Sequence, residues 1–137
     1  MLFLKTIDKI TPKNLKKLSK YLENHEKEGY FGFWNAGIFE KEKKIVKTGN
    51  FWQKKFLNWA KGDDLLPNFI PSTTLSFWKN ENLIGLSNIR HELPPHLLKF
   101  GGNIGYNVGK MHENQGFGTK ILKLTLKFSK IHKNSST

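Results

Sequence analysis

One segment of this 137-residue sequence limits the choice of fold more than any other, because a strand pattern, two glycines and a helix pattern follow each other directly. Residues 102–108 are typical of a strand, and residues 115–119 read Gln-Gly-Phe-Gly-Thr immediately before a helical repeat. A helix start carries unpaired backbone N–H groups and a partial positive charge, and glycines let an anion approach that backbone closely. The segment therefore predicts an anion or phosphate site, and the alternative is a glycine turn that merely starts a helix. The residues expected on the inner face of that helix are Ile121, Leu122, Thr125 and Phe128.

Periodicity and turn residues organise the rest of the chain. The expected elements are a strand over 2–7, helices over 12–27 and 50–60, and a hairpin of strands 73–78 and 83–90 with a polar turn over 79–82. Thr11-Pro12 is typical of a helix start, and the first helix has apolar residues at helical spacing, which are Leu15, Leu18, Tyr21 and Leu22. Asn50 is the expected cap of the second helix, and Gly105 in the last strand indicates a bulge or the close approach of a ligand. Residues 30–49 fit a strand or an aromatic loop, and 132–137 show no pattern. The order β-α-α-β-β-β-α predicts an α/β fold of the α+β kind, with a mixed sheet built on hairpins.

The composition narrows the class of partner. The formal net charge is +12, but Arg90 is the only arginine and the lysines are scattered along the chain. Readers of nucleic acid usually depend on the planar fork of arginine, so a basic nucleic-acid-binding module is the less favoured alternative. The lysines are interpreted as solvated side chains, or as charges that attract an anionic cofactor.

The residue types that are missing exclude other classes. The sequence has no cysteine, which excludes disulfides, thiolate metal sites and a cysteine nucleophile. Its apolar stretches are far shorter than the roughly 20 residues that span a bilayer, so we expect a cytoplasmic protein with no membrane partner.

His91 and Glu92 are the candidate catalytic residues. A zinc motif of the HExxH type needs two histidines four residues apart on one helix, whereas His96 follows His91 by five and Pro94 and Pro95 prevent a helix. We therefore expect no metal site. An imidazole titrates near neutral pH, so His91 is suited to take a proton from an amine. The alternative is that these side chains only cap the end of a strand.

Three runs of residues, at 83–93, 101–108 and 115–119, resemble a GNAT N-acetyltransferase in order and spacing. The pair Ile-Arg-His-Glu-Leu and Gly-Gly-x-Ile-Gly-Tyr-x-Val is more specific than the glycine loop alone. The resemblance covers about residues 70–130. It implies the acyl-CoA N-acyltransferase fold in a single domain over 1–137, with acetyl-CoA as co-substrate.

The resemblance also assigns roles. The pantetheine arm of acetyl-CoA is expected to pair with the backbone of Tyr106, Asn107 and Val108, at a bulge. The pyrophosphate is expected on the loop and helix start, at Gln115, Gly116, Phe117, Gly118 and Thr119. An amine of a small molecule or a peptide then attacks the thioester directly, near His91 and Glu92. The family's loop begins with Gln or Arg where this chain has Glu113, and a carboxylate repels a pyrophosphate.

Relatives continue past the last helix with a strand, a helix and two more strands, whereas this sequence ends at Thr137. The resemblance therefore predicts a fold that is incomplete at the C-terminus, with an open edge on the fourth strand. Alternatives to an active acetyltransferase are a catalytically inactive, truncated remnant and a chain that a partner completes. A homodimer is among the assemblies that remain open.

Overall fold

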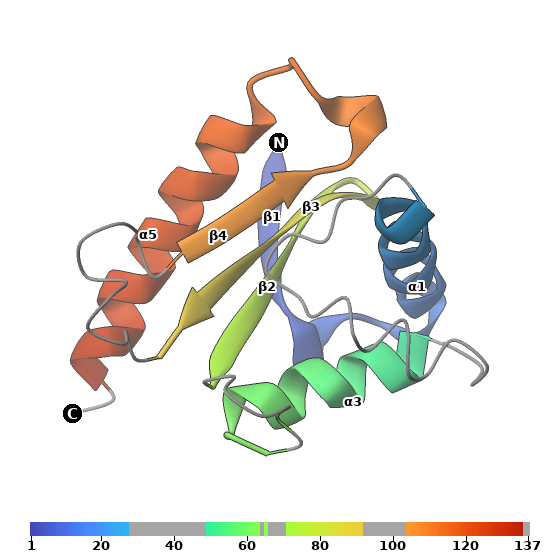
Figure 1. Ribbon diagram of the computed structural model, residues 1–137. Helices are drawn as coiled ribbons and strands as arrows, with labels where there is room; N and C mark the ends of the chain where they lie inside the picture. The colour runs from blue at the N-terminus through green and yellow to red at the C-terminus, as the bar shows by residue number, and fades with distance from the viewer. Residues whose placement is uncertain (28–48, 64, 66–70, 92–103, 136–137) are drawn as a thin grey trace.

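A four-stranded sheet lies between two layers of helix (Figure 1). The computed structural model describes residues 1–27, 49–63, 65, 71–91 and 104–135. The predicted alternatives for 30–49 fall almost entirely outside these residues. Among the described helices, none is long and apolar enough to cross a membrane.

The chain order of the elements agrees with the predicted order. They are β1 (Leu2–Thr6), η1 (Ile7–Lys9), α1 (Pro12–Lys27), α3 (Gly49–Ala60), β2 (Ser72–Lys79), β3 (Asn82–Arg90), β4 (Ile104–Val108), η2 (Lys110–His112) and α5 (Phe117–Ser135). Two predicted boundaries are wrong. Helix α3 already includes Gly49, so Asn50 lies inside its first turn and does not cap it. Helix α5 continues to Ser135, because extending a helix that tertiary packing has already nucleated costs little even through polar residues.

The strand order is β1-β2-β3-β4, and each pair of neighbours is antiparallel. The predicted hairpin of β2 and β3 is confirmed. The mixed sheet that we expected has only antiparallel pairs in the described part of the chain. Helices α1 and α3 cover one face of the sheet, and α5 covers the other (Figure 1).

A β-bulge lies at the start of β3. Phe77 pairs with Gly85 and Trp78 pairs with Leu83, so Ile84 has no partner in β2. The extra residue changes the alternation of side chains, which is why Leu83 and Leu86 reach the same core cluster although they are three residues apart. Of the two alternatives for Gly105, the bulge is wrong, because β4 pairs with β3 in an unbroken register from Ile104 to Val108. The same register contradicts the bulge that the resemblance implied at residues 106–108.

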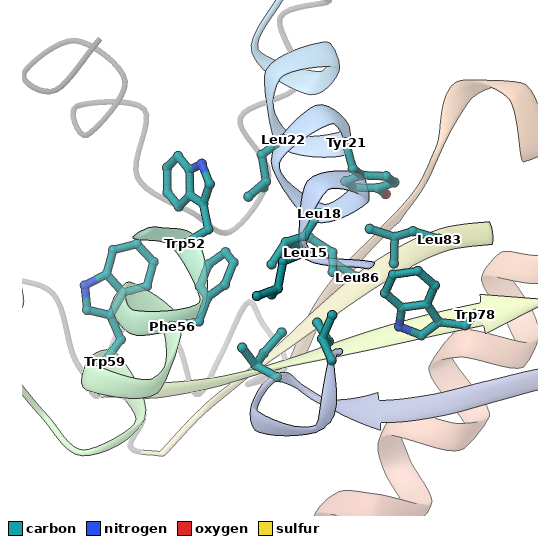
Figure 2. Packing of buried hydrophobic residues seen from close by; sticks show 12 residues of the cluster. Leu15, Leu18, Tyr21, Leu22, Trp52, Phe56, Trp59, Trp78, Leu83 and Leu86 are labelled. Atoms are coloured by element: carbon teal, nitrogen blue, oxygen red, sulfur yellow. The ribbon is translucent and has the colours of Figure 1, made fainter. Parts of the chain in front are cut away.

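The larger core cluster fills the space between the sheet and helices α1 and α3 (Figure 2). Trp52, Phe56 and Trp59 form a row along α3, with Trp52 stacked on Phe56 at 5.9 Å between ring centroids. Gly49 lets α3 begin directly against α1, since a Cβ there would lie 2.1 Å from the carbonyl oxygen of Leu15. Burying large aromatic side chains contributes about 3 kcal/mol or more each, so this cluster provides much of the stability. The smaller cluster joins α5 to the other face of the sheet.

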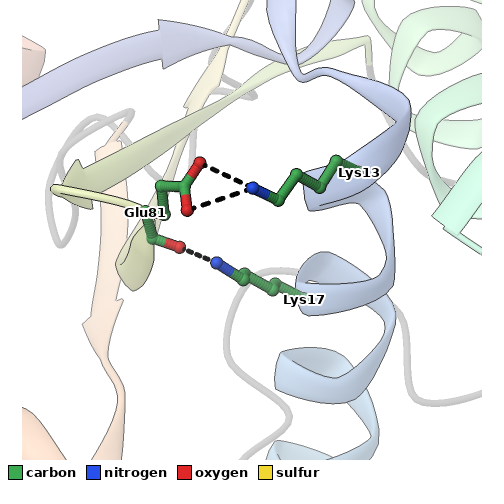
Figure 3. Close-up of polar contacts among 3 residues, drawn as sticks. All are labelled: Lys13, Lys17 and Glu81. Atoms are coloured by element: carbon green, nitrogen blue, oxygen red, sulfur yellow. Dashed lines mark hydrogen bonds and ion pairs between the residues drawn. The ribbon is translucent and has the colours of Figure 1, made fainter.

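The turn between β2 and β3 is tied to α1 on the surface (Figure 3). Lys13 Nζ lies 3.2 Å from Glu81 Oε1, and Lys17 donates a hydrogen bond to the Glu81 carbonyl. The hydrogen bond from Lys13, with the charges of both lysines, lowers the pKa of Glu81. The pair is exposed, so it orients the turn more than it stabilises the fold.

Candidate functional site

The candidate site is built where β4 ends and the chain returns into α5. The Gly109 N–H donates to the Ile84 carbonyl at 2.8 Å, so the bulge in β3 anchors the start of the loop. Two residues then adopt positive φ angles, Asn114 at 65° and Gly116 at 82°. A Cβ on Gly116 would meet no atom within 4 Å, so the backbone angle, and not space, makes glycine suitable there.

The first turn of α5 presents free backbone donors. Among the described residues, none accepts a hydrogen bond from the N–H groups of Phe117, Gly118 or Thr119, while the Lys120 N–H bonds the Gly116 carbonyl at 3.4 Å. This turn contains no acidic residue. The amide of Gln115 donates to the Met111 carbonyl at 3.3 Å, so that side chain closes the loop. The helix start can therefore bind an anion.

Two lysine ammonium groups stand beside this turn. Lys79, from the end of β2, and Lys120, from α5, each place Nζ 5.8 Å from the ring centroid of Phe117. Phe117 itself is buried and fixes both lysines near the helix start. The two charges add to the partial positive charge of the helix. Lys79 is a site residue that sequence reasoning missed, because its contact with Phe117 joins residues that are far apart in the chain.

Strand β4 passes directly beside the helix start. A Cβ on Gly118 would lie 3.4 Å from Tyr106 Cε2 and 3.8 Å from Val108 Cγ2, both in ordinary contact. The structure thus brings together the two groups of predicted cofactor-binding residues, on β4 and on the loop.

The backbone groups of β4 alternate in direction. The Gly109 N–H and the Asn107 carbonyl point toward β3. Since this direction alternates along an antiparallel strand, the N–H and carbonyl groups of Tyr106 and Val108 point to the outer edge of the sheet. In the described part of the chain no strand pairs with that edge. The backbone carbonyl of Asn107 points toward β3, so it is not exposed at the outer edge as the backbone groups of Tyr106 and Val108 are.

The side chain of Asn107 lies on the opposite face of the sheet, against α1. The Tyr21 hydroxyl donates to Asn107 Oδ1 at 2.5 Å, whereas Asn107 Nδ2 is buried without a hydrogen-bond acceptor. Burial, and to a smaller extent the charge of Glu113, raise the pKa of Tyr21 above its ordinary value. The negative charge of the Glu113 carboxylate therefore disfavours ionisation of the Tyr21 hydroxyl. The helical pattern marked Tyr21 only as a core position, so no sequence signal identified this contact.

His91, one of the two candidate catalytic residues, lies at the other end of the sheet. His91 follows β3 and is exposed, and its Nε2 lies 2.7 Å from Thr73 Oγ1. It is six residues from Gly85, the partner of Val108, which corresponds to about 20 Å along the strand. The structure thus does not place His91 beside the start of α5. Glu92 lies outside the described residues.

In these layers a strand leads through a glycine loop into the covering helix, which is the arrangement that the predicted fold requires. No known family model and no curated protein sequence matches the chain. Its structure is similar to that of PaiA N-acetyltransferase from Thermoplasma acidophilum in complex with coenzyme A, with a TM-score of 0.52 and 13% sequence identity. The similarity covers 99% of this chain and 74% of that chain. The predicted fold is confirmed.

Proposed function

We propose that this chain binds acetyl-CoA and transfers the acetyl group to an amine. The observation that carries the proposal is the arrangement of the α5 start beside β4. There, three backbone N–H groups have no acceptor among the described residues, and two lysines stand beside the glycine turn. The similar PaiA structure contains coenzyme A, whose pyrophosphate suits such a helix start.

The pyrophosphate binds the N–H groups of Phe117, Gly118 and Thr119, and Lys79 and Lys120 offset its charge. The pantetheine arm lies along the outer edge of β4, where the backbone groups of Tyr106 and Val108 offer donors and acceptors for its amides. Asn107 was also expected to pair with the pantetheine arm, but it is left out of the proposal because its backbone carbonyl faces β3.

In the proposed reaction, the amine nitrogen attacks the thioester carbonyl carbon and forms the new C–N bond. The C–S bond then breaks, its electron pair stays on sulfur, and the thiolate takes up a proton. His91, which is exposed at the end of β3, is the proposed acceptor for the proton that the amine loses. The acceptor substrate is a small-molecule or peptide amine.

The binding step is tested by calorimetry of the 137-residue chain with coenzyme A, and turnover by release of the coenzyme A thiol in the presence of amines. Because the chain has no cysteine, a thiol reagent detects only the product. We expect a Kd for coenzyme A in the micromolar range. Turnover is measured with acetyl-CoA and a mixture of small amines and lysine peptides as acceptors. Binding without turnover would support the non-catalytic alternative, and lack of binding in the folded chain would refute the proposal.

The matched variants are Gly118→Asp and Asn50→Asp. Each places a carboxylate in the first turn of a helix, the first in α5 and the second at an exposed position of α3. We expect Gly118→Asp to abolish coenzyme A binding and Asn50→Asp to leave it unchanged.

A further inference from the structure

Arg90 is the only arginine of the chain and the last residue of β3. Its side chain is half-buried, and no carboxylate of the described residues forms an ion pair with its guanidinium. A guanidinium is always charged in proteins, and its planar fork of N–H donors matches the two oxygens of a carboxylate. Partial burial of such a group without a partner costs free energy, so Arg90 calls for an anionic ligand.

A hydroxyl donor lies opposite Arg90 on the same face of the sheet. Ser72 is the Cα partner of Arg90 in the β2–β3 ladder, and the side chains of such a pair point to the same face. The Asn88 amide donates a hydrogen bond to Ser72 Oγ at 3.0 Å, so this oxygen already serves as an acceptor. In the described part of the chain, no group accepts a hydrogen bond from the Ser72 hydroxyl. The guanidinium and the hydroxyl are therefore neighbouring donors that a carboxylate can satisfy together.

These two donors lie at the end of the sheet toward which the proposed co-substrate extends. Ile104, the first residue of β4, pairs with Ile89, which directly precedes Arg90. From Ile104, β4 runs for about 14 Å to Val108, beside the start of α5. A pantetheine arm that follows β4 from phosphates bound at α5 therefore carries its thioester toward Arg90 and His91.

We infer that Arg90 and the Ser72 hydroxyl bind a carboxylate of the acceptor, so that the acceptor is an amine that also carries a carboxylate. The inference rests on the proposed function. A carboxylate held by the guanidinium leaves the amine of the same molecule free to face the thioester. The formal net charge of +12 favours the same class, because it attracts anionic acceptors and repels polycationic amines. Free amino acids and peptides with a free C-terminus are the two sources of such a group.

The single arginine allows a test on the unsubstituted chain. With ¹⁵N-labelled arginine, the protein gives one side-chain Nε signal in an NMR spectrum, which is recorded with saturating coenzyme A. A mixture of amino acids and a mixture of tripeptides are titrated separately, each beside its C-terminally amidated counterpart. We expect a saturable shift of the signal with at least one free-acid mixture, which identifies the source, and none with either amidated mixture.

Three outcomes of this titration would contradict the inference. A signal that no free-acid mixture moves, in a chain that binds coenzyme A, would overturn the inference and leave the proposed function standing. An equal shift with sodium acetate would show a non-specific contact with anions and would also overturn it. A chain that does not bind coenzyme A would overturn the proposed function as well.

Kinetics of Arg90→Gln complete the test. A hydrogen bond between charged groups contributes about 1.5–3 kcal/mol, so kcat/KM for the free-acid acceptor should fall by about 10- to 100-fold, mainly through KM. The amidated acceptor and the Kd for coenzyme A should change by no more than about twofold. Lys16→Gln, which removes an exposed charge from α1, is the matched control and should change neither acceptor. Equal losses for the free-acid and amidated acceptors would show that Arg90 does not recognise the carboxylate.

Discussion

Gly85 should be the least replaceable residue near the candidate site. A Cβ at this position would lie 2.4 Å from the Asn107 carbonyl oxygen and 2.7 Å from Ile121 Cδ1. Carbon and carbonyl oxygen normally approach no closer than about 3.3 Å, so β4 would have to retreat by about 1 Å. The backbone of β4 cannot rotate away as a flexible side chain can, and the contact would loosen both the β3–β4 ladder and the packing of α5.

We expect Gly85→Ala to lower the free energy of unfolding by about 3 kcal/mol, the upper part of the usual range for overpacking. For a chain of this size, the thermal midpoint should fall by about 10 °C. Thermal unfolding followed by circular dichroism measures this change.

Gly118→Ala is the matched control. It adds the same methyl group next to β4, but at ordinary contact distances of 3.4 Å and 3.8 Å. Because Gly118 lies in α5, alanine there should raise the free energy of unfolding by about 0.5–1 kcal/mol. A midpoint for Gly85→Ala within about 2 °C of the wild type would refute the steric argument.

Three further predictions concern the contacts around the site. Thr125→Val should lower the free energy of unfolding, measured with denaturant, by about 1–2 kcal/mol, because the buried Ser87 hydroxyl loses its hydrogen-bond partner at 2.8 Å. Adding Ser87→Ala to this variant should recover most of that loss. If the two substitutions instead lower the free energy of unfolding by independent, additive amounts, the pairing is contradicted. Since the pKa of Tyr21 is raised on folding, its contribution to stability is complete below the unfolded tyrosine value of about 10 and is lost as the pH rises above it. Tyr21→Phe should therefore lose less stability than the wild type between pH 9 and about 11, and parallel curves would speak against this. Changing both Lys79 and Lys120 to alanine should raise the Kd for coenzyme A by on the order of tenfold at low salt and by much less at high salt. An increase in Kd that does not depend on salt would exclude an effect of the two charges.

The sequence predicted the elements well where local signals are strong. The Thr11-Pro12 start and the regular leucines of α1 fix a helix, and the polar turn between β2 and β3 fixes a hairpin. The end of α5 could not be read in this way, because its last turn has no apolar repeat and continues only by helix propagation.

The site was predicted in part. The glycine loop indicated the helix start, and the structure brings that start beside β4 as expected. The position of the bulge was not predictable, since a bulge depends on the register of two strands, and Ile84 is an apolar residue like its paired neighbour Leu83. His91 remains a proposed base, at the far end of the sheet from the loop.

By itself, the sequence determined the order of the elements, the inner face of α1, most of the inner face of α5, and the glycine turn at Gly116. In α5 the leucine that packs against the core cluster is Leu124 and not the predicted Leu122. These properties depend on residues within a few positions of one another, where periodicity and backbone angles act directly. Only the tertiary structure decided that Tyr21 meets Asn107 across 86 residues, and that Lys79 stands beside Phe117. Such contacts arise when the two helix layers close on the sheet, so packing, and not local pattern, sets which side chains the candidate site contains.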